Sequence, residues 1–151
     1  GEKMYVMTPY LILEEAMIET LLEAVRRGVD VRIITPHIPD KKHIKYMTEY
    51  NYGILLKNGI RIYEYEPGFI HSKVVMNEHC AIVGTINMDY RSLFLHFECG
   101  TLLFHNSQIA ALRKDVERTL PQCREIMRSD CRTNLPGTAL DSVLRLLSPL
   151  M

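Results

Sequence analysis

The sequence has no excess of charge of either sign, because 18 Lys and Arg residues balance 18 Asp and Glu residues in a chain of 151. A chain without net charge generates no overall field that would draw it onto nucleic acid or anionic lipid. We therefore expect no nucleic-acid partner. Any anion-binding site must be a local one.

The cysteines also lack the close pairs that metal and redox sites need. There are four of them, Cys80, Cys99, Cys123 and Cys131. No two form a Cys-x-x-Cys motif, and a chain that is 47% hydrophobic can build its core without disulfides. His79 and Cys80 are adjacent and would face opposite sides of a strand, so His79 and His96 do not complete a zinc site. We expect free thiols, no metal and no other cofactor.

Long apolar runs are missing as well. No run approaches the roughly 20 residues that span a bilayer, and no basic-then-apolar signal segment opens the chain. We therefore expect the chain as given to be soluble. It starts at Gly1 and enters a strand-like segment almost at once, which favours a piece of a longer protein. The Gly-x-Ser-x-Gly elbow of serine hydrolases is absent too.

The apolar residues that are present alternate between the periods of strands and helices. Residues 3–7 predict a buried strand, and a helix from about Glu14 is followed by a strand over 29–34. The first helix has an apolar stripe of Met17, Ile18, Leu21, Leu22 and Val25, with Gly28 at its end. Two such crossovers in succession predict parallel strands with helices packed on them.

The second crossover repeats this outline. Asp40 is a candidate N-cap for a helix that Gly59 ends, and residues 60–65 predict the next strand. The apolar stripe of this helix consists of Ile44, Met47, Ile54 and Leu55.

Beyond residue 68 the pattern changes to a hairpin, with strands over 71–76 and 80–84. Another strand is predicted near 97–104. A helix with Ile109, Leu112 and Val116 on one face follows and ends at Pro121, and Thr138 with Asp141 forms a capping box before a last helix. Residues 1–151 therefore predict one α/β domain, a mixed β-sheet flanked by helices.

The first strand of the hairpin carries the most informative short stretch, His71-Ser72-Lys73. Residues two apart on a strand face the same side, so the His71 and Lys73 side chains should project together. A lysine beside a histidine suits a phosphate, which the ammonium neutralises while the imidazole attacks or transfers a proton. By itself the pair is also compatible with a solvated strand edge, and His43-Ile44-Lys45 repeats the spacing on a predicted helix.

Polar residues that follow favour the phosphate interpretation. Gly84-Thr85-Ile86-Asn87 forms a small polar turn near the level of His71, and Thr85 and Asn87 can both donate to phosphate oxygens. Glu98 can accept a hydrogen bond from the second imidazole nitrogen of His71 and orient the ring.

These residues resemble the phospholipase D superfamily, whose motif is His-x-Lys, four residues, Asp, then commonly Gly-Ser/Thr-x-Asn. Here it reads "HSKVVMNE" and "GTIN", with Glu78 in place of the usual Asp. "VMTPYLILEEAMIETLLEAVRRGVDVRIITP", "YEYEPGFIHSK" and "MDYRSLFLHFE" resemble the C-terminal half of bacterial cardiolipin synthases. The resemblance implies a phospholipase D-like α/β/α sandwich.

It also implies a function. Two such motifs would meet in one metal-free site that condenses two phosphatidylglycerols to cardiolipin and glycerol through a phosphohistidine. His71 would serve as acid and base, Lys73 and Asn87 would bind phosphate with help from Thr85, Glu98 would orient His71, and Glu78 would support the fold. The implied partners are phosphatidylglycerol, membrane lipid, and the N-terminal half of the same enzyme or a second copy, with the parent enzyme at the bacterial membrane.

Two alternatives stay open. One is a homodimeric phosphodiesterase or nuclease of the same superfamily with one motif per chain, and the other is a catalytically silent interaction domain. Tyr10 is explained by core packing or by a place at the substrate entrance. The basic run over 40–45 is interpreted as a solvated helix face.

Overall fold

A computed structural model describes residues 1–131, and the predicted Thr138–Asp141 capping box lies outside this range. The elements in chain order are β1 (Lys3–Met7), β2 (Leu11–Ile12), α1 (Glu15–Arg26), β3 (Asp30–Pro36), α2 (Lys42–Lys57), β4 (Arg61–Tyr65), β5 (Val74–Met76), β6 (Cys80–Gly84), β7 (Met88–Asp89), the π-helical turn η1 (Arg91–Leu95), β8 (Gly100–Phe104), α3 (Gln108–Thr119), the 3-10 turn η2 (Leu120–Gln122), β9 (Cys123–Ile126) and the 3-10 turn η3 (Arg128–Asp130).

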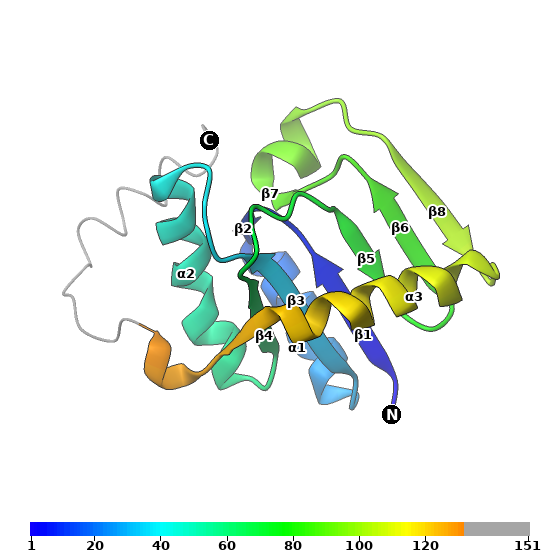
Figure 1. The fold of residues 1–151 in the computed structure, drawn as a ribbon, viewed down its shortest axis with the longest axis horizontal. Coiled ribbons are helices and arrows are strands. Elements are labelled where there is room, and N and C mark those ends of the chain that lie inside the picture. The colour runs from blue at the N-terminus through cyan, green and yellow to red at the C-terminus, as the bar shows by residue number, and fades with distance from the viewer. Residues whose placement is uncertain (132–151) are drawn as a thin grey trace.

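Seven strands form one mixed sheet in the order β8-β6-β5-β1-β3-β4-β9 (Figure 1). The neighbours β1, β3 and β4 are parallel, as two crossovers through α1 and α2 require. The hairpin β5–β6 joins the sheet antiparallel to β1, and β8 extends it to the edge. The expected mixed sheet with flanking helices is confirmed.

The helices cover the two faces of this sheet and give the domain its three layers. On one face α1 and α2 bury Ile18, Leu22 and Leu55 against Val6 and Ile33. On the other face α3, in front of the sheet in Figure 1, packs onto β1, β3 and β5. Apolar residues that alternate along β1, β3 and β4 therefore serve two separate cores.

Several predicted boundaries were wrong. His71 and Lys73 precede β5, which starts at Val74, and Glu98 precedes β8, which starts at Gly100. Asp40 does not cap α2, because the N-cap position is Lys41 and no side-chain cap bond forms there.

The buried face of α2 and the last strand within residues 1–131 also differ from the prediction. Ile54 was expected in the core and is 45% exposed, since the buried stripe instead includes Asn51 and Tyr52. The unpredicted strand β9 pairs antiparallel with β4, so the described chain does not close on helices alone.

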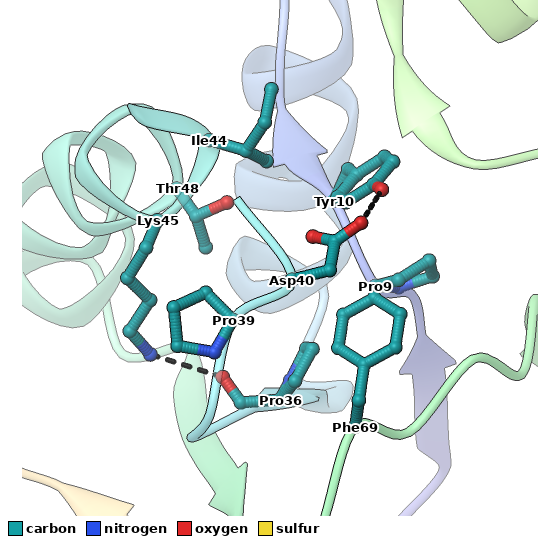
Figure 2. A pocket seen from close by; sticks show the side chains of 9 residues that line it. All are labelled: Pro9, Tyr10, Pro36, Pro39, Asp40, Ile44, Lys45, Thr48 and Phe69. Atoms are coloured by element: carbon teal, nitrogen blue, oxygen red, sulfur yellow. Dashed lines mark hydrogen bonds between the residues drawn. The ribbon is translucent and has the colours of Figure 1, made fainter. Parts of the chain in front are cut away.

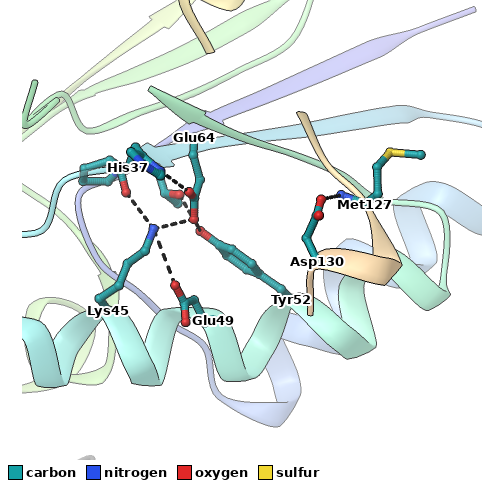
Figure 3. A network of polar contacts seen from close by, with 9 residues as sticks. His37, Lys45, Glu49, Tyr52, Glu64, Met127 and Asp130 are labelled. Carbon is teal, nitrogen blue, oxygen red and sulfur yellow. Dashed lines mark hydrogen bonds and ion pairs between the residues drawn. The ribbon is translucent and has the colours of Figure 1, made fainter. Parts of the chain in front are cut away.

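A buried polar cluster ties α2 to the parallel strands (Figure 3). Glu64 on β4 is only 3% exposed and accepts hydrogen bonds from the Lys45 ammonium and from the Tyr52 hydroxyl at 3.2 Å. His37 Nδ1 lies 2.7 Å from the second carboxylate oxygen of Glu64. The Tyr52 hydroxyl also lies 2.7 Å from that of Thr35. This cluster explains the second His-x-Lys stretch, because Lys45 points inward while His43 stays exposed.

One apolar surface of the sheet lies beyond the helices. Ile82 on β6 pairs with Leu102 on β8, and both side chains are exposed together with Phe104. Ile82 also pairs with Val75, which packs against the core beneath α1 and α2. Ile82 therefore lies on the same face of the sheet as these two helices. Exposed apolar patches of this kind on a sheet are typical of interfaces with another protein surface.

Candidate active site

The candidate site lies where β1 and β3 end and β5 begins. Met7, the last residue of β1, pairs with Ile34 of β3 on one side and with Val74 of β5 on the other. The segment 69–73 therefore reaches the sheet at the carboxyl ends of the parallel strands. This edge is where open α/β sheets bind their ligands.

His71 and Lys73 contact each other at this edge. The Lys73 ammonium lies 3.0 Å from the ring nitrogens of His71 and donates to the His71 carbonyl oxygen at 2.9 Å. Their side chains thus meet as expected, although on an extended segment instead of a strand. A phosphate oxygen that displaced the imidazole from the ammonium would be held within reach of the same histidine.

Lys73 is half-buried, and its charge is tuned by its surroundings. Burial lowers the pKa of Lys73 below its usual value, and the carboxylates of Glu98 and Asp89 partly offset this shift. Asp89 is buried and accepts the Ser92 amide at 2.7 Å. The sequence interpretation missed Asp89, although its place two residues after Asn87 in the polar turn could have indicated it.

The turn after β6 depends on the glycine of the motif. A Cβ atom on Gly84 would lie 2.2 Å from the Cys99 carbonyl oxygen, so no side chain fits where β6 and β8 approach. Thr85 follows at the sheet edge, where its amide donates to that same carbonyl at 2.9 Å. Asn87 keeps its Oδ1 atom buried without a partner among residues 1–131. A buried acceptor of this kind needs a donor from water or a ligand.

Glu98 contacts Thr85 and not the expected histidine. The Thr85 hydroxyl donates to Glu98 Oε2, and His96 Nδ1 lies 3.6 Å from Oε1. The Thr85 hydrogen bond is the main reason that the pKa of Glu98 lies below its usual range, with smaller effects from Ser92, His96 and Lys73. No bond from Glu98 to His71 occurs within the described residues, so its orienting role stays a prediction.

Glu78 lies in the hairpin turn, away from His71. Its carboxylate accepts the backbone amide of Lys3 at 3.2 and 3.3 Å and lies 3.8 Å from Arg113 of α3. It therefore links the hairpin to the start of β1 and to α3. This placement fits the structural role that the resemblance implies, and the longer side chain of Glu still makes the connection.

Phe69 connects the motif with a second feature, a slot between the β1–β2 connection and α2 (Figure 2). The Phe69 ring lies 5.5 Å from the His71 ring, centroid to centroid, and also lines the slot. The Tyr10 hydroxyl donates to Asp40 Oδ2 at 2.5 Å across the slot's mouth. Tyr10 also packs against the apolar cluster of Ile12, Ile44 and Met47, so the core-packing explanation is confirmed, and its place at a substrate entrance stays a prediction.

Beyond the Glu98 side of the site, η1 presents apolar side chains to solvent. These are Leu93, Phe94, Leu95 and, just after the turn, Phe97. Four exposed large apolar residues in so short a segment are unusual for a surface that faces only water. They form a second apolar surface beside the candidate site.

Within residues 1–131, no group of three His, Cys, Asp or Glu side chains comes together as metal ligands would. In the same range, no helix is long and apolar enough to cross a bilayer.

Residues 1–120 match the family model described as "Cardiolipin synthase, PLD-like domain". Curated relatives include an uncharacterized protein of Streptococcus mutans, 44% identical over 97% of this chain and 32% of its own length. Cardiolipin synthase 2 of Bacillus cereus is 36% identical over 99% of this chain and 30% of its own. The cardiolipin synthase of Clostridium perfringens is 33% identical over 99% of this chain and 32% of its own length. The chain spans about a third of these relatives.

Solved structures agree on the fold. Phosphatidylserine synthase of Haemophilus influenzae superposes with a TM-score of 0.78 at 15% identity, over 100% of this chain and 42% of its own. Nuc of Salmonella typhimurium, a phospholipase D family member, superposes with a TM-score of 0.70 at 16% identity. The match covers 83% of this chain and 82% of Nuc. At such low identities the likeness concerns the fold alone.

Proposed function

Because the chain belongs to the family of phospholipase D-like domains of cardiolipin synthases, we propose that it supplies one half of a phosphatidyltransferase active site. The observation that carries this proposal is the contact between Lys73 Nζ and the His71 ring at 3.0 Å. It pairs a phosphate-binding cation with a group that can move a proton. We further propose that residues 1–151 form the C-terminal half of a longer enzyme at the bacterial membrane, in which another region brings the second motif.

The reaction would proceed in two displacements at one phosphorus. A histidine of the other motif attacks the phosphorus of phosphatidylglycerol, and glycerol leaves with a proton from His71. The hydroxyl of a second phosphatidylglycerol then gives its proton to His71 and attacks the phosphohistidine, which releases cardiolipin and the free histidine.

Lys73 and Asn87 would stabilise the equatorial oxygens as negative charge builds on them. The half-buried ammonium of Lys73 is suited to this task, because a charge removed from bulk water interacts more strongly with a phosphate. Asn87 would contact these oxygens through its amide NH2 group, because its buried Oδ1 is an acceptor that needs a donor such as water.

His71→Ala in the full-length enzyme tests the proposal. Loss of a general acid–base group alone costs roughly 10² to 10⁴ in turnover. Cardiolipin formation by the variant should fall at least that far, while Asp115→Asn, exposed on α3, should keep kcat close to normal. Near-normal turnover of the His71 variant would refute the assignment.

A second candidate is a homodimeric phosphodiesterase in which each chain gives one motif. It is supported by the likeness to Nuc, because that chain is matched over 82% of its own length by this one domain. The balanced charge argues against a nucleic-acid substrate. The exposed face with Ile82, Leu102 and Phe104 would accommodate a second copy or the other half of a longer enzyme.

A concentration series separates the two candidates. The purified chain is assayed for cardiolipin formation and for phosphodiester hydrolysis, both alone and mixed with the separately expressed N-terminal half. The half-site proposal expects activity only in the mixture. Activity of the chain alone that rises with the square of its concentration supports the homodimer.

A further inference from the structure

The second apolar surface, named here the apolar turn, consists of Leu93, Phe94, Leu95 and Phe97 and projects from the molecule. Phe97 is fully exposed, and Phe94 is 60% exposed. The Tyr90 ring packs on the Phe94 ring with 4.9 Å between centroids. In Figure 1 this segment is the light-green turn at the top, between β7 and β8. Aromatic rings and leucines of this kind are enriched where proteins meet the surface of a bilayer.

The apolar turn is anchored to the candidate site at both of its ends. At its start the buried Ser92 donates its amide to Asp89 Oδ1 at 2.7 Å. At its end Glu98 follows Phe97 directly in the sequence. The carboxylates of Asp89 and Glu98 both interact electrostatically with the Lys73 ammonium. The base of the apolar turn therefore borders the lysine that would bind a lipid phosphate.

The charges around the apolar turn favour an anionic surface. Residues 90–97 include Arg91 and His96 but no acidic residue. Arg91 is exposed, and its Nε atom donates to His96 Nε2 at 2.7 Å. The flanking acids are largely withdrawn from solvent, since Asp89 is 6% exposed and the Glu98 side chain 14%. Cationic side chains beside exposed apolar groups are complementary to the headgroups and acyl chains of anionic lipid.

The proposed substrate gives a reason for this arrangement. Phosphatidylglycerol is anionic, and its phosphate lies at the surface of the bilayer while its acyl chains stay in the hydrocarbon, because their exposure to water is unfavourable. The slot beside Phe69 could not shelter such a chain, since its volume of about 10 Å³ suits a single water molecule. The site must therefore reach the phosphorus at the bilayer surface.

The other apolar surface is suited to a different partner. Ile82, Leu102 and Phe104 lie on the paired strands β6 and β8, which form a broad and rigid face. A face of this kind fits another protein surface. The apolar turn is a single short segment whose side chains project outward, so they can enter a layer of lipid headgroups without a matching surface.

We propose that the apolar turn inserts into the surface of an anionic bilayer and so holds Lys73 and His71 against the lipid phosphates. The inference rests on the proposed phosphatidyltransferase function and adds how the site meets its substrate. Phosphatidylglycerol would then act both as the substrate and as the surface that binds the apolar turn.

Tryptophan fluorescence tests the insertion, because the chain has no tryptophan of its own. Phe97→Trp places a reporter on the apolar turn, and Phe104→Trp places a matched one on the sheet face. Each 151-residue variant is mixed with vesicles of phosphatidylcholine and phosphatidylglycerol in equal parts, with and without brominated acyl chains that quench tryptophan on contact. The emission of Phe97→Trp should shift to the blue and be quenched by the brominated lipid, whereas that of Phe104→Trp should change in neither respect.

Co-sedimentation with the same vesicles measures how strongly the chain binds. Phe94→Ser/Phe97→Ser should weaken binding about 100-fold, since loss of each large apolar side chain from the contact costs about tenfold. Leu102→Ser/Phe104→Ser is the matched control and should bind as the unmodified chain does. Arg91→Gln should weaken binding about fivefold on these vesicles and have no effect on vesicles of phosphatidylcholine alone. Circular dichroism verifies that each variant is folded.

Several results would overturn the inference. Unquenched emission from Phe97→Trp on bound vesicles excludes insertion, and quenching of Phe104→Trp in its place assigns the lipid contact to the sheet face. Equal binding by Phe94→Ser/Phe97→Ser removes the apolar turn from the contact. Self-association that this variant abolishes, without any vesicle binding, assigns the apolar turn to a protein interface. These measurements need no turnover, so they can fail while the full-length enzyme still makes cardiolipin, a function that His71→Ala tests separately.

Discussion

Replacing Lys45 by Met tests whether the Glu64 cluster stabilises the domain as its geometry indicates. The Glu64 side chain is 5% exposed and that of Lys45 is 14% exposed, so the variant leaves a carboxylate buried without its main cation. Breaking a buried pair by removal of one partner costs about 3–5 kcal/mol. His37, 43% exposed, stays bonded to Glu64, and we therefore expect about 3 kcal/mol, the lower end of that range.

Urea unfolding of the 151-residue chain, followed by circular dichroism, measures this loss. With a slope of about 2 kcal/mol per molar urea, the midpoint should fall by roughly 1.5 M. Lys42→Met, one turn earlier on the exposed face of α2, is the control and should change stability by less than about 0.5 kcal/mol.

The double variant Lys45→Met/Glu64→Leu distinguishes an ion pair from simple packing. It removes both charges, and the Tyr52 hydroxyl keeps its contact with Thr35 at 2.7 Å. Replacement of a buried pair by apolar residues is often nearly neutral, so the double variant should be more stable than Lys45→Met alone. A loss of under about 1 kcal/mol in Lys45→Met would refute the reasoning. A loss in the double variant equal to the sum of the losses in Lys45→Met and Glu64→Leu would also refute it.

Three further predictions concern the candidate site. Gly84→Ala should cost about 2 kcal/mol or more in urea unfolding because of the clash with Cys99, whereas Gly53→Ala, on α2 with open space around it, should be neutral or stabilising. The alkaline limb of kcat/KM should lie below pH 10.5, because Lys73 with its lowered pKa loses its charge early; Lys73→Arg should move that limb upward, and an unmoved limb contradicts the assignment. Thr85→Val should raise the pKa of Glu98 in a carboxylate NMR titration, and an unchanged value would show that Thr85 does not set it.

The layers of the fold were predictable because they depend on local periodicity. Apolar residues at helical spacing marked α1, and alternating apolar residues bounded by Gly28 and Gly59 marked β3 and β4. Both glycines have a φ of +87°, the left-handed conformation that ends a helix without strain at glycine alone. Where such signals were weak, prediction failed: β9 has only one buried residue, and its pairing with β4 is decided by tertiary contacts.

The residues of the motif were predictable, but most of their partners were not. The spacing indicated that His71 and Lys73 would meet, since residues two positions apart on an extended segment point to the same side. The partner of Asp40 could not be read in the same way, because the sequence offers the helix that follows as its neighbour and the fold brings Tyr10 from 30 positions away. Long-range polar contacts depend on the exact approach of separate elements, which no local pattern encodes.

The Thr85–Glu98 contact changes how the phosphate would be held. A threonine hydroxyl has one proton, and in this structure it goes to Glu98. Thr85 therefore cannot donate to a phosphate oxygen while that bond persists, and its lone pairs would repel one. The proton becomes available only if Glu98 turns to another donor, such as the His71 ring it was expected to orient. The two predicted roles, Thr85 on phosphate and Glu98 on His71, are thus compatible with each other, because release of the Thr85 proton leaves Glu98 Oε2 open to another donor.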